Sequence, residues 1–234
     1  MMYMPPQDPS RATLVLVHGG AHGSWCWDRI VPLIEEHGTG LVTMNLPCTD
    51  EDAGAATYSE VVLDSLAAVR GPIVLVGHSL AGLVIPLVAS RRPVAHQVFL
   101  AAFMPIPGMS LSDQQREDRP FFPFPATRAE LKQRWYNRCS AEDAEWAFAQ
   151  TTVQASRPLE EKTPLHEWPS TPSTYVVCSD DRACRPAWAK AASAALFGKA
   201  PTLIAEADHS PFLSRPAELA RTLLGIADTV ATRS

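Results

Sequence analysis

A serine at a sharp turn between two apolar runs constrains the fold of this chain more than any other feature. The run at 72–76 leads into Gly77-His78-Ser79-Leu80-Ala81-Gly82, and a second apolar run spans 83–89. This order predicts a strand, a tight turn and a helix, with the spacing G-x-S-x-G except that Ala81 replaces the last glycine. The neighbours must be small because strand and helix nearly touch, and the serine is held strained with its hydroxyl exposed. We therefore predict that Ser79 is a nucleophile.

Two later apolar runs end in residues that complete a catalytic triad. The run at 174–178 is followed by Ser179-Asp180-Asp181, and the run at 202–205 by Glu206-Ala207-Asp208-His209. In an open parallel sheet with such a nucleophile, the acid and then the histidine follow in this chain order at the carboxyl ends of later strands. His209 is therefore predicted to take the proton from Ser79, while a carboxylate orients its imidazole.

The identity of that carboxylate is open among three aspartates. Asp208 is adjacent to His209, so its side chain is expected to point away from the ring. Asp180 and Asp181 leave the same loop in different directions. The residues by themselves do not choose between these two.

A glycine loop after an early strand is predicted to complete the site. The run at 13–17 leads through His18 into Gly19 and Gly20, whose lack of a Cβ lets the backbone approach a nucleophile closely. A backbone N–H of this loop and the N–H of Leu80 are expected to stabilise an oxyanion. A phosphate-binding loop is the rival interpretation, but neither G-x-G-x-x-G nor G-x-x-x-x-G-K-[ST] is present.

The composition limits the classes of partner and cofactor. A chain of 234 residues with 46% apolar content can bury one sizeable core. The net charge is −5 and no basic stripe occurs, so nucleic acid is not expected as a partner; nor is a membrane, because no apolar run approaches about 20 residues. Five scattered cysteines predict reduced thiols in a cytoplasmic protein, without a metal site or cofactor. A monomer or homodimer is expected.

Apolar runs alternate with helical patterns along most of the chain. This alternation predicts an α/β fold with a mainly parallel sheet of about six strands flanked by helices. The strands are expected at about 12–17, 41–46, 72–76, 96–101, 174–178 and 201–205.

A segment without a buried strand interrupts this rhythm. Helical patterns lie at about 127–138 and 140–150, between proline-rich borders. We predict a small helical cap at 105–172 on a core formed by 1–104 and 173–234. A cap over a nucleophile encloses an apolar pocket, and the residues predicted to line it are His18, Gly19, Phe103, Phe121, Phe122 and Trp135.

Several of these motifs resemble one family over nearly the whole chain. They are L-V-L-V-H-G-G-A-H-G-S-W-C-W at 14–27, V-G-H-S-L-A-G at 76–82, V-F-L-A-A-F-M-P at 98–105, Y-V-V-C-S-D-D at 175–181 and A-D-H-S-P at 207–211. The chain is similar to the α/β-hydrolase superfamily, in the branch of plant methyl esterases and hydroxynitrile lyases that also has bacterial members. Arginine outnumbers lysine, which favours a bacterial source. The resemblance implies that Asp181 is the triad acid and that Gly20 supplies the first oxyanion N–H.

That branch contains two chemistries, and two positions separate them. The hydroxynitrile lyases of the branch that this chain resembles carry a threonine at the position of Gly19 and a lysine at the position of Ser210. Both differences indicate ester hydrolysis, so we expect a serine carboxylesterase that acts on small apolar or aromatic esters, methyl esters among them. The alternatives are a lyase, a non-hydrolytic biosynthetic catalyst or a ligand-binding receptor on the same fold.

Overall fold

The computed structural model describes residues 2–6, 8, 10–122 and 127–232. Within these residues seven strands form one sheet in the order β1-β3-β2-β4-β5-β6-β7. Their bounds are β1 Met2–Met4, β2 Thr13–Val17, β3 Gly40–Thr43, β4 Ile73–His78, β5 His96–Leu100, β6 Ser173–Cys178 and β7 Thr202–Ile204. Neighbouring strands are parallel except β1, which pairs antiparallel with β3. The predicted α/β fold is confirmed, with β1 as a strand that the sequence patterns did not indicate.

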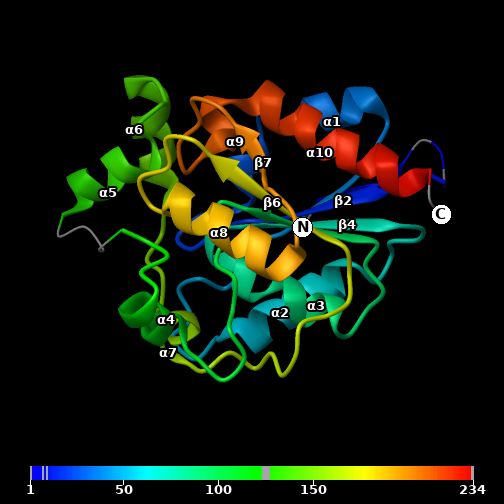
Figure 1. Cartoon of the computed structure of the whole chain (residues 1–234). Coiled ribbons are helices and arrows are strands. Elements are labelled where there is room, and N and C mark those ends of the chain that lie inside the picture. The colour runs from blue at the N-terminus through cyan, green and yellow to red at the C-terminus, as the bar shows by residue number, and fades with distance from the viewer. Residues whose placement is uncertain (1, 7, 9, 123–126, 233–234) are drawn as a thin grey trace.

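Helices cover both faces of this sheet (Figure 1). One face packs against α2 Ala55–Ser65, α3 Ile85–Ala89 and α8 Pro186–Phe197. The other packs against α1 Val31–His37, the short α9 Pro211–Ser214 and α10 Pro216–Ala231. Covering both faces explains why every residue of the central strands β2, β3 and β4 is buried, as in parallel sheets that are covered on both sides.

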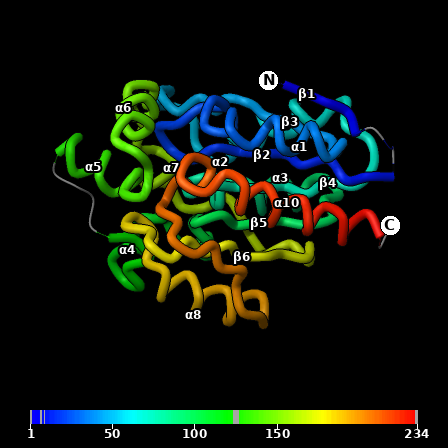
Figure 2. The backbone as a smooth tube through the Cα atoms, turned by 90° about the horizontal axis from the view of Figure 1, so that it is seen from above, coloured from blue at the N-terminus to red at the C-terminus, as the bar shows by residue number. Residues whose placement is uncertain are grey.

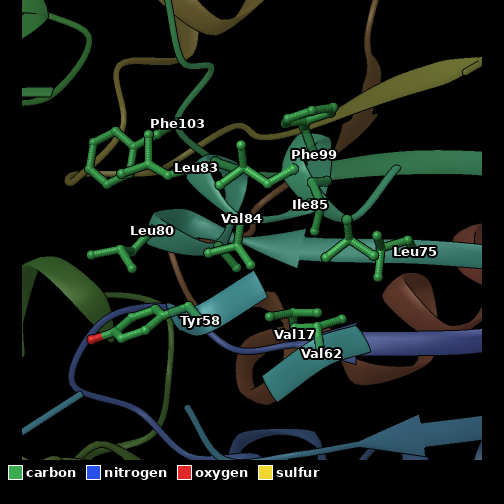
Figure 3. Packing of buried hydrophobic residues seen from close by; sticks show 14 of the residues in the cluster. Val17, Tyr58, Val62, Leu75, Leu80, Leu83, Val84, Ile85, Phe99 and Phe103 are labelled. Atoms are coloured by element: carbon green, nitrogen blue, oxygen red, sulfur yellow. The ribbon is translucent and has the colours of Figure 1, made fainter. Parts of the chain in front are cut away.

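The two sides of the sheet carry separate apolar clusters. Val15, Val17 and Leu75 point to the side of α2, whereas Leu14 and Leu16 point to the side of α10. Figure 3 shows the first cluster, in which side chains of β2, β4 and β5 meet those of α2 and of the turn after β4. Each fully buried side chain of this size contributes about 1.5–3 kcal/mol relative to an exposed one. This packing holds the carboxyl ends of the strands in fixed positions.

The described residues between β5 and β6 form four helices, in the range predicted as a cap. They are α4 Leu111–Glu117, α5 Arg128–Trp135, α6 Ala141–Gln150 and α7 Arg157–Glu160. Figure 2 shows α4, α5 and α6 gathered at the end of the molecule opposite the C-terminus. The predicted cap range includes 123–126, which lie outside the described residues. Its division from the core, with bounds at 105 and 172, stays a prediction.

Three of these helices begin at side-chain caps. Ser110 and Thr127 each accept a hydrogen bond from the backbone N–H three residues later and complete capping boxes with Asp113 and Glu130. Ser140 accepts in the same way from the N–H of Asp143. Such caps satisfy backbone donors that a helix leaves unpaired at its start, and each stabilises its helix by about 1 kcal/mol. Local sequence therefore sets where these helices begin.

In the parts of the chain that the structure describes, no helix combines the length and the apolar character that crossing a bilayer would need.

Candidate active site

The turn after β4 holds Ser79 in an unusual backbone conformation. Its φ is 51°, in the left-handed region that non-glycine residues rarely adopt. A Cβ on Gly77 would lie 2.8 Å from Ile85 and 2.9 Å from the Ala81 carbonyl oxygen. A Cβ on Gly82 would lie 1.9 Å from the Phe103 carbonyl oxygen. The turn therefore needs glycine at 77, as the motif predicted, and also at 82, one position beyond the motif. It begins a 3₁₀-helix at Ser79–Leu83 that precedes α3.

Ser79, His209 and Asp181 form one hydrogen-bonded chain. The Ser79 Oγ lies 3.0 Å from His209 Nε2, and His209 Nδ1 lies 2.9 Å from Asp181 Oδ2. The side chains of His209 and Asp181 are each only 3% exposed. The other Asp181 oxygen accepts from the backbone N–H groups of Ala183 and Cys184, at 2.7 and 2.9 Å. A carboxylate fixed in this way holds the imidazole with Nδ1 protonated, which leaves Nε2 as an acceptor for the serine proton.

The other two candidate acids have different partners. Asp180 pairs with Arg138, whose Nε and guanidinium nitrogen lie 2.7 and 2.6 Å from Oδ2. Asp208 Oδ2 accepts from the Arg138 backbone N–H at 2.8 Å. Its Oδ1 accepts from Ser210 N–H and Ser214 Oγ at 3.0 and 2.7 Å. Of the three carboxylates that the residues left open, the structure brings Asp181 to His209.

The glycine loop after β2 lies directly against Ser79. A Cβ on Gly19 would lie 2.9 Å from the Ser79 Cβ and 2.7 Å from His78 Nδ1, so a larger residue would displace its neighbours. The Gly19 carbonyl accepts from His18 Nδ1 at 2.8 Å. Because the peptide is trans, the Gly20 N–H of the same unit points away from the His18 ring. The Leu80 amide lies in the first turn of the 3₁₀-helix, where backbone donors have no helical partner.

Two buried histidines fix the conformation of this loop. His18 Nε2 accepts from the Leu46 N–H at 2.9 Å, so the network assigns its proton to Nδ1. His22 Nδ1 lies 2.8 Å from the Gly20 carbonyl oxygen, and its Nε2 lies 2.8 Å from the Tyr136 hydroxyl. Burial lowers the pKa of His18 to about 4 and the pKa of His22 to about 3. Both rings are therefore neutral near pH 7 and act as hydrogen-bonding struts.

Because the pKa values of His18 and His22 are lowered in the folded protein, we expect the free energy of unfolding to fall in mild acid. The ordinary histidine pKa is 6.5, and the folded pKa values are the lower ones. The unfolded chain therefore binds more protons as the pH falls through 6.5, and stability decreases until the folded pKa values are reached. Urea denaturation at pH 7 and pH 5 is expected to show a loss of about 2 kcal/mol for each histidine.

Variants separate this effect from general acid sensitivity. In His22→Gln the stability should depend less steeply on pH over this interval, because one titrating ring is gone. His166 is exposed, so His166→Gln should keep the dependence of the unmodified protein. An unfolding free energy that is equal at pH 7 and pH 5 would contradict the prediction.

A pocket of about 380 Å³ reaches Ser79 and His209. Four of the predicted lining residues border it, namely Phe103, Phe121, Phe122 and Trp135. His18 and Gly19 do not border it. The His18 ring is fully buried between the loop and the Leu46 amide, and Gly19 is pressed against His78 and Ser79. These two residues support the wall of the pocket from behind.

Residues that the sequence did not single out also line this pocket. They are Ala21, His22, His78, Arg128, Leu131, Arg134, Thr151, Thr152, Val153, Gln154, Leu159 and Ala183. The H-G-x-x-H spacing could have indicated His22, and His78 is part of the serine motif. The residues at 151–154 belong to no motif. Among the described residues, no group of three or more His, Cys, Asp or Glu side chains is arranged to hold a metal ion.

Comparisons with known proteins agree on one family. A family model described as "Alpha/beta hydrolase family" matches residues 14–222. "Probable esterase PIR7A" of Oryza sativa is 31% identical, over 91% of this chain and 95% of that protein. "Polyneuridine aldehyde esterase" of Rauvolfia serpentina is 26% identical, over 92% and 95%. "Methylesterase 3" of Arabidopsis thaliana is 26% identical, over 96% and 99%.

A solved structure shows the same fold. The crystal structure of polyneuridine aldehyde esterase superimposes with a TM-score of 0.79 at 24% sequence identity. The match covers 92% of this chain and 99% of the solved one.

Proposed function

The chain belongs to the alpha/beta hydrolase family, and from this premise we propose that it is a serine carboxylesterase for small apolar or aromatic esters, methyl esters among them. The observation that carries the proposal is the chain of hydrogen bonds from Ser79 through His209 to Asp181, at a pocket lined by aromatic side chains. The esterase and methylesterase names of its relatives support the same reaction class.

The proposed reaction has two halves. The Ser79 Oγ attacks the ester carbonyl while His209 Nε2 takes the hydroxyl proton, and the Gly20 and Leu80 amides stabilise the oxyanion. His209 then gives this proton to the departing alcohol, which leaves an acyl group on Ser79. In the second half His209 takes a proton from water, which attacks the acyl carbon. Collapse of that intermediate releases the acid and returns the proton to Ser79.

The pocket favours a particular shape of ester. Its volume of about 380 Å³ lies near the lower end of the range for small-molecule sites, about 300–1,000 Å³. Phe103 and Phe121 contact each other with their ring centroids 3.7 Å apart and their planes tilted by 41°, and both form part of the pocket wall. An ester with a flat apolar body and a small alcohol fits these limits better than a long acyl chain or a charged peptide. The experiment is a panel of methyl and short-chain aryl esters, with triolein as a long-chain comparison.

Mandelonitrile cleavage distinguishes hydrolysis from the alternative lyase reaction. We expect it to be much slower than aryl-ester hydrolysis, because Gly19 and Ser210 stand where the lyases carry threonine and lysine. Ser210 is fully buried, and a Cβ on Gly19 would already be too close to Ser79. Both rates are measured on the same enzyme preparation. Faster cyanide release than ester hydrolysis would overturn the esterase assignment, and ligand binding without turnover would favour a receptor.

We also propose that the protein works in a reducing compartment such as the cytoplasm. All five cysteines are free, and four of them are buried. Burial raises the pKa of the Cys26, Cys178 and Cys184 thiols well above the ordinary value, so these groups stay protonated. Such thiols are unreactive packing groups rather than partners in disulfides.

A further inference from the structure

Residues 151–155, which we call the strap, follow α6 and run against the glycine loop. The Thr152 N–H donates to the Ala21 carbonyl at 2.9 Å, and the Ala155 N–H donates to the Cys48 carbonyl at 2.8 Å. The Ala21 N–H in turn donates to the Gln154 Oε1 at 3.2 Å. Both polar backbone groups of Ala21 are therefore bonded to the strap, although the two segments are 133 positions apart from Ala21 to Gln154.

Ala21, the residue bonded to the strap, has a strained backbone conformation. Ala21 has a φ of 61°, in the left-handed region where an alanine is strained. A strained residue keeps its conformation only where its surroundings determine it. The strap supplies such surroundings, because its two hydrogen bonds fix the peptide units on either side of the Ala21 α-carbon.

The Gln154 amide is itself fixed in orientation. Its Nε2 donates to the Tyr58 hydroxyl at 3.1 Å and to the Ala155 carbonyl at 2.9 Å, so its Oε1 must face the glycine loop. The Tyr58 side chain is fully buried in the apolar cluster, and its hydroxyl points away from the other labelled side chains (Figure 3). A Cβ on Gly20 would lie 3.0 Å from Gln154 Oε1 and 3.4 Å from its Cδ and Cγ. The side chain therefore fills the space beside the Gly20 α-carbon.

We propose that Gln154 is a positioning residue for the oxyanion hole, an inference that rests on the proposed esterase function. It bonds to the Ala21 N–H and packs against Gly20, and thereby holds the Gly20 N–H toward the carbonyl oxygen of an ester on Ser79. The strap residues Thr151, Thr152 and Val153 also line the pocket. The strap thus contributes to the pocket wall and also holds the backbone of the glycine loop that carries the Gly20 N–H.

The first test replaces Gln154 with methionine, which has a similar shape but neither the acceptor nor the donors. We expect kcat to fall about 10- to 100-fold, because a misplacement of about 1 Å at a reacting group can cost about 100-fold. KM should change little, as for an interaction made only in the transition state. The rate constant kinact for phosphonylation of Ser79 by a fluorophosphonate should fall in parallel. Gln150→Met is the matched control, since Gln150 is exposed at the end of α6.

The second test is a double-mutant cycle between the two contacting positions. In the unmodified protein, Gly20→Ala should lower kcat, because the new methyl displaces the Gln154 amide from the Ala21 N–H. In the Gln154→Ala background the same change should cost several-fold less, because the space is free. Non-additivity of this kind reports direct contact between the two residues. Circular dichroism and Tm identify the folded variants, and the cycle needs no data from Gln154→Met.

Defined results would overturn the inference. Unchanged kcat and kinact in Gln154→Met, or a raised KM alone, would reduce Gln154 to a part of the pocket wall. Equal effects of Gly20→Ala in the two backgrounds would remove the proposed contact. Failure of the esterase proposal is recognised separately, as an unmodified enzyme that hydrolyses no ester on the panel. Even then the kinact comparison decides whether Gln154 positions the oxyanion hole.

Discussion

Replacing Ser79 with alanine is expected to abolish ester hydrolysis while leaving the protein folded. The hydroxyl borders the pocket and bonds to His209 rather than filling the core, so its removal leaves no cavity in either apolar cluster. The expected loss in kcat is about 10³-fold or more, as for serine hydrolases that lose their nucleophile. Turnover of a methyl or aryl ester by the purified variant is the measurement, with Tm as the check on folding.

The control for this prediction is a serine outside the pocket. Ser112 lies on α4, and Ser112→Ala should retain the activity of the unmodified protein. A fluorophosphonate should label the unmodified protein at Ser79, as located by mass spectrometry of the peptides, and should not label Ser79→Ala. Turnover in Ser79→Ala close to that of the unmodified protein would remove this residue from the mechanism.

Asp181→Asn is expected to lower kcat by about 10⁴-fold, as replacement of the histidine-orienting carboxylate does in related chemistry. The backbone N–H groups of Ala183 and Cys184 face one oxygen of the side chain and would retain the amide oxygen of the asparagine there. The amide NH₂ would then face His209 Nδ1 and donate to it. An imidazole that accepts at Nδ1 carries its proton on Nε2, so it cannot take the proton from Ser79.

The neighbouring aspartates serve as matched controls. Asp180→Asn removes an exposed ion pair with Arg138, which contributes little to stability or chemistry. Asp208→Asn places an amide NH₂ among backbone donors, so its expected effect is on Tm more than on kcat. The measurement is kcat for all three variants on one substrate. A crippled Asp180→Asn together with a mild Asp181→Asn would show that the proposed acid is displaced by one residue.

The strands that carry the site were predictable because each is a continuous apolar run that ends in glycine or polar residues. β2 and β4 are of this kind, and they place the glycine loop and Ser79 at neighbouring strand ends. β1 lacks such a signal, since Met2–Met4 has three residues at the edge of the sheet and exists through its pairing with β3. Its strand character comes from a contact between distant segments, which local patterns do not record.

The site residues that belong to a sequence motif could be predicted, and those outside the motifs could not. Ser79 and His209 follow from position in the chain, whereas the direction of Asp181 depends on the amides of the turn after β6. His18 was expected in the pocket, but its ring accepts a hydrogen bond from the Leu46 N–H and therefore lies behind the glycine loop. Gln154 reaches the glycine loop from a distant segment of irregular backbone. Its role depends on tertiary structure and leaves no pattern in the chain.

The close contact at Gly82 has a consequence for laboratory evolution of new substrate preferences. The backbone of Phe103 has a close neighbour on two sides. Its carbonyl oxygen occupies the space that a Cβ on Gly82 would fill, and its N–H donates to the Ser79 carbonyl at 3.0 Å. Its side chain, however, faces the pocket. A substitution at position 103 alters the pocket wall and keeps the backbone hydrogen bond to Ser79 available, whereas every substitution at position 82 forces the two segments apart. Substrate preference can thus be changed through the side chain at position 103 while its backbone stays in place.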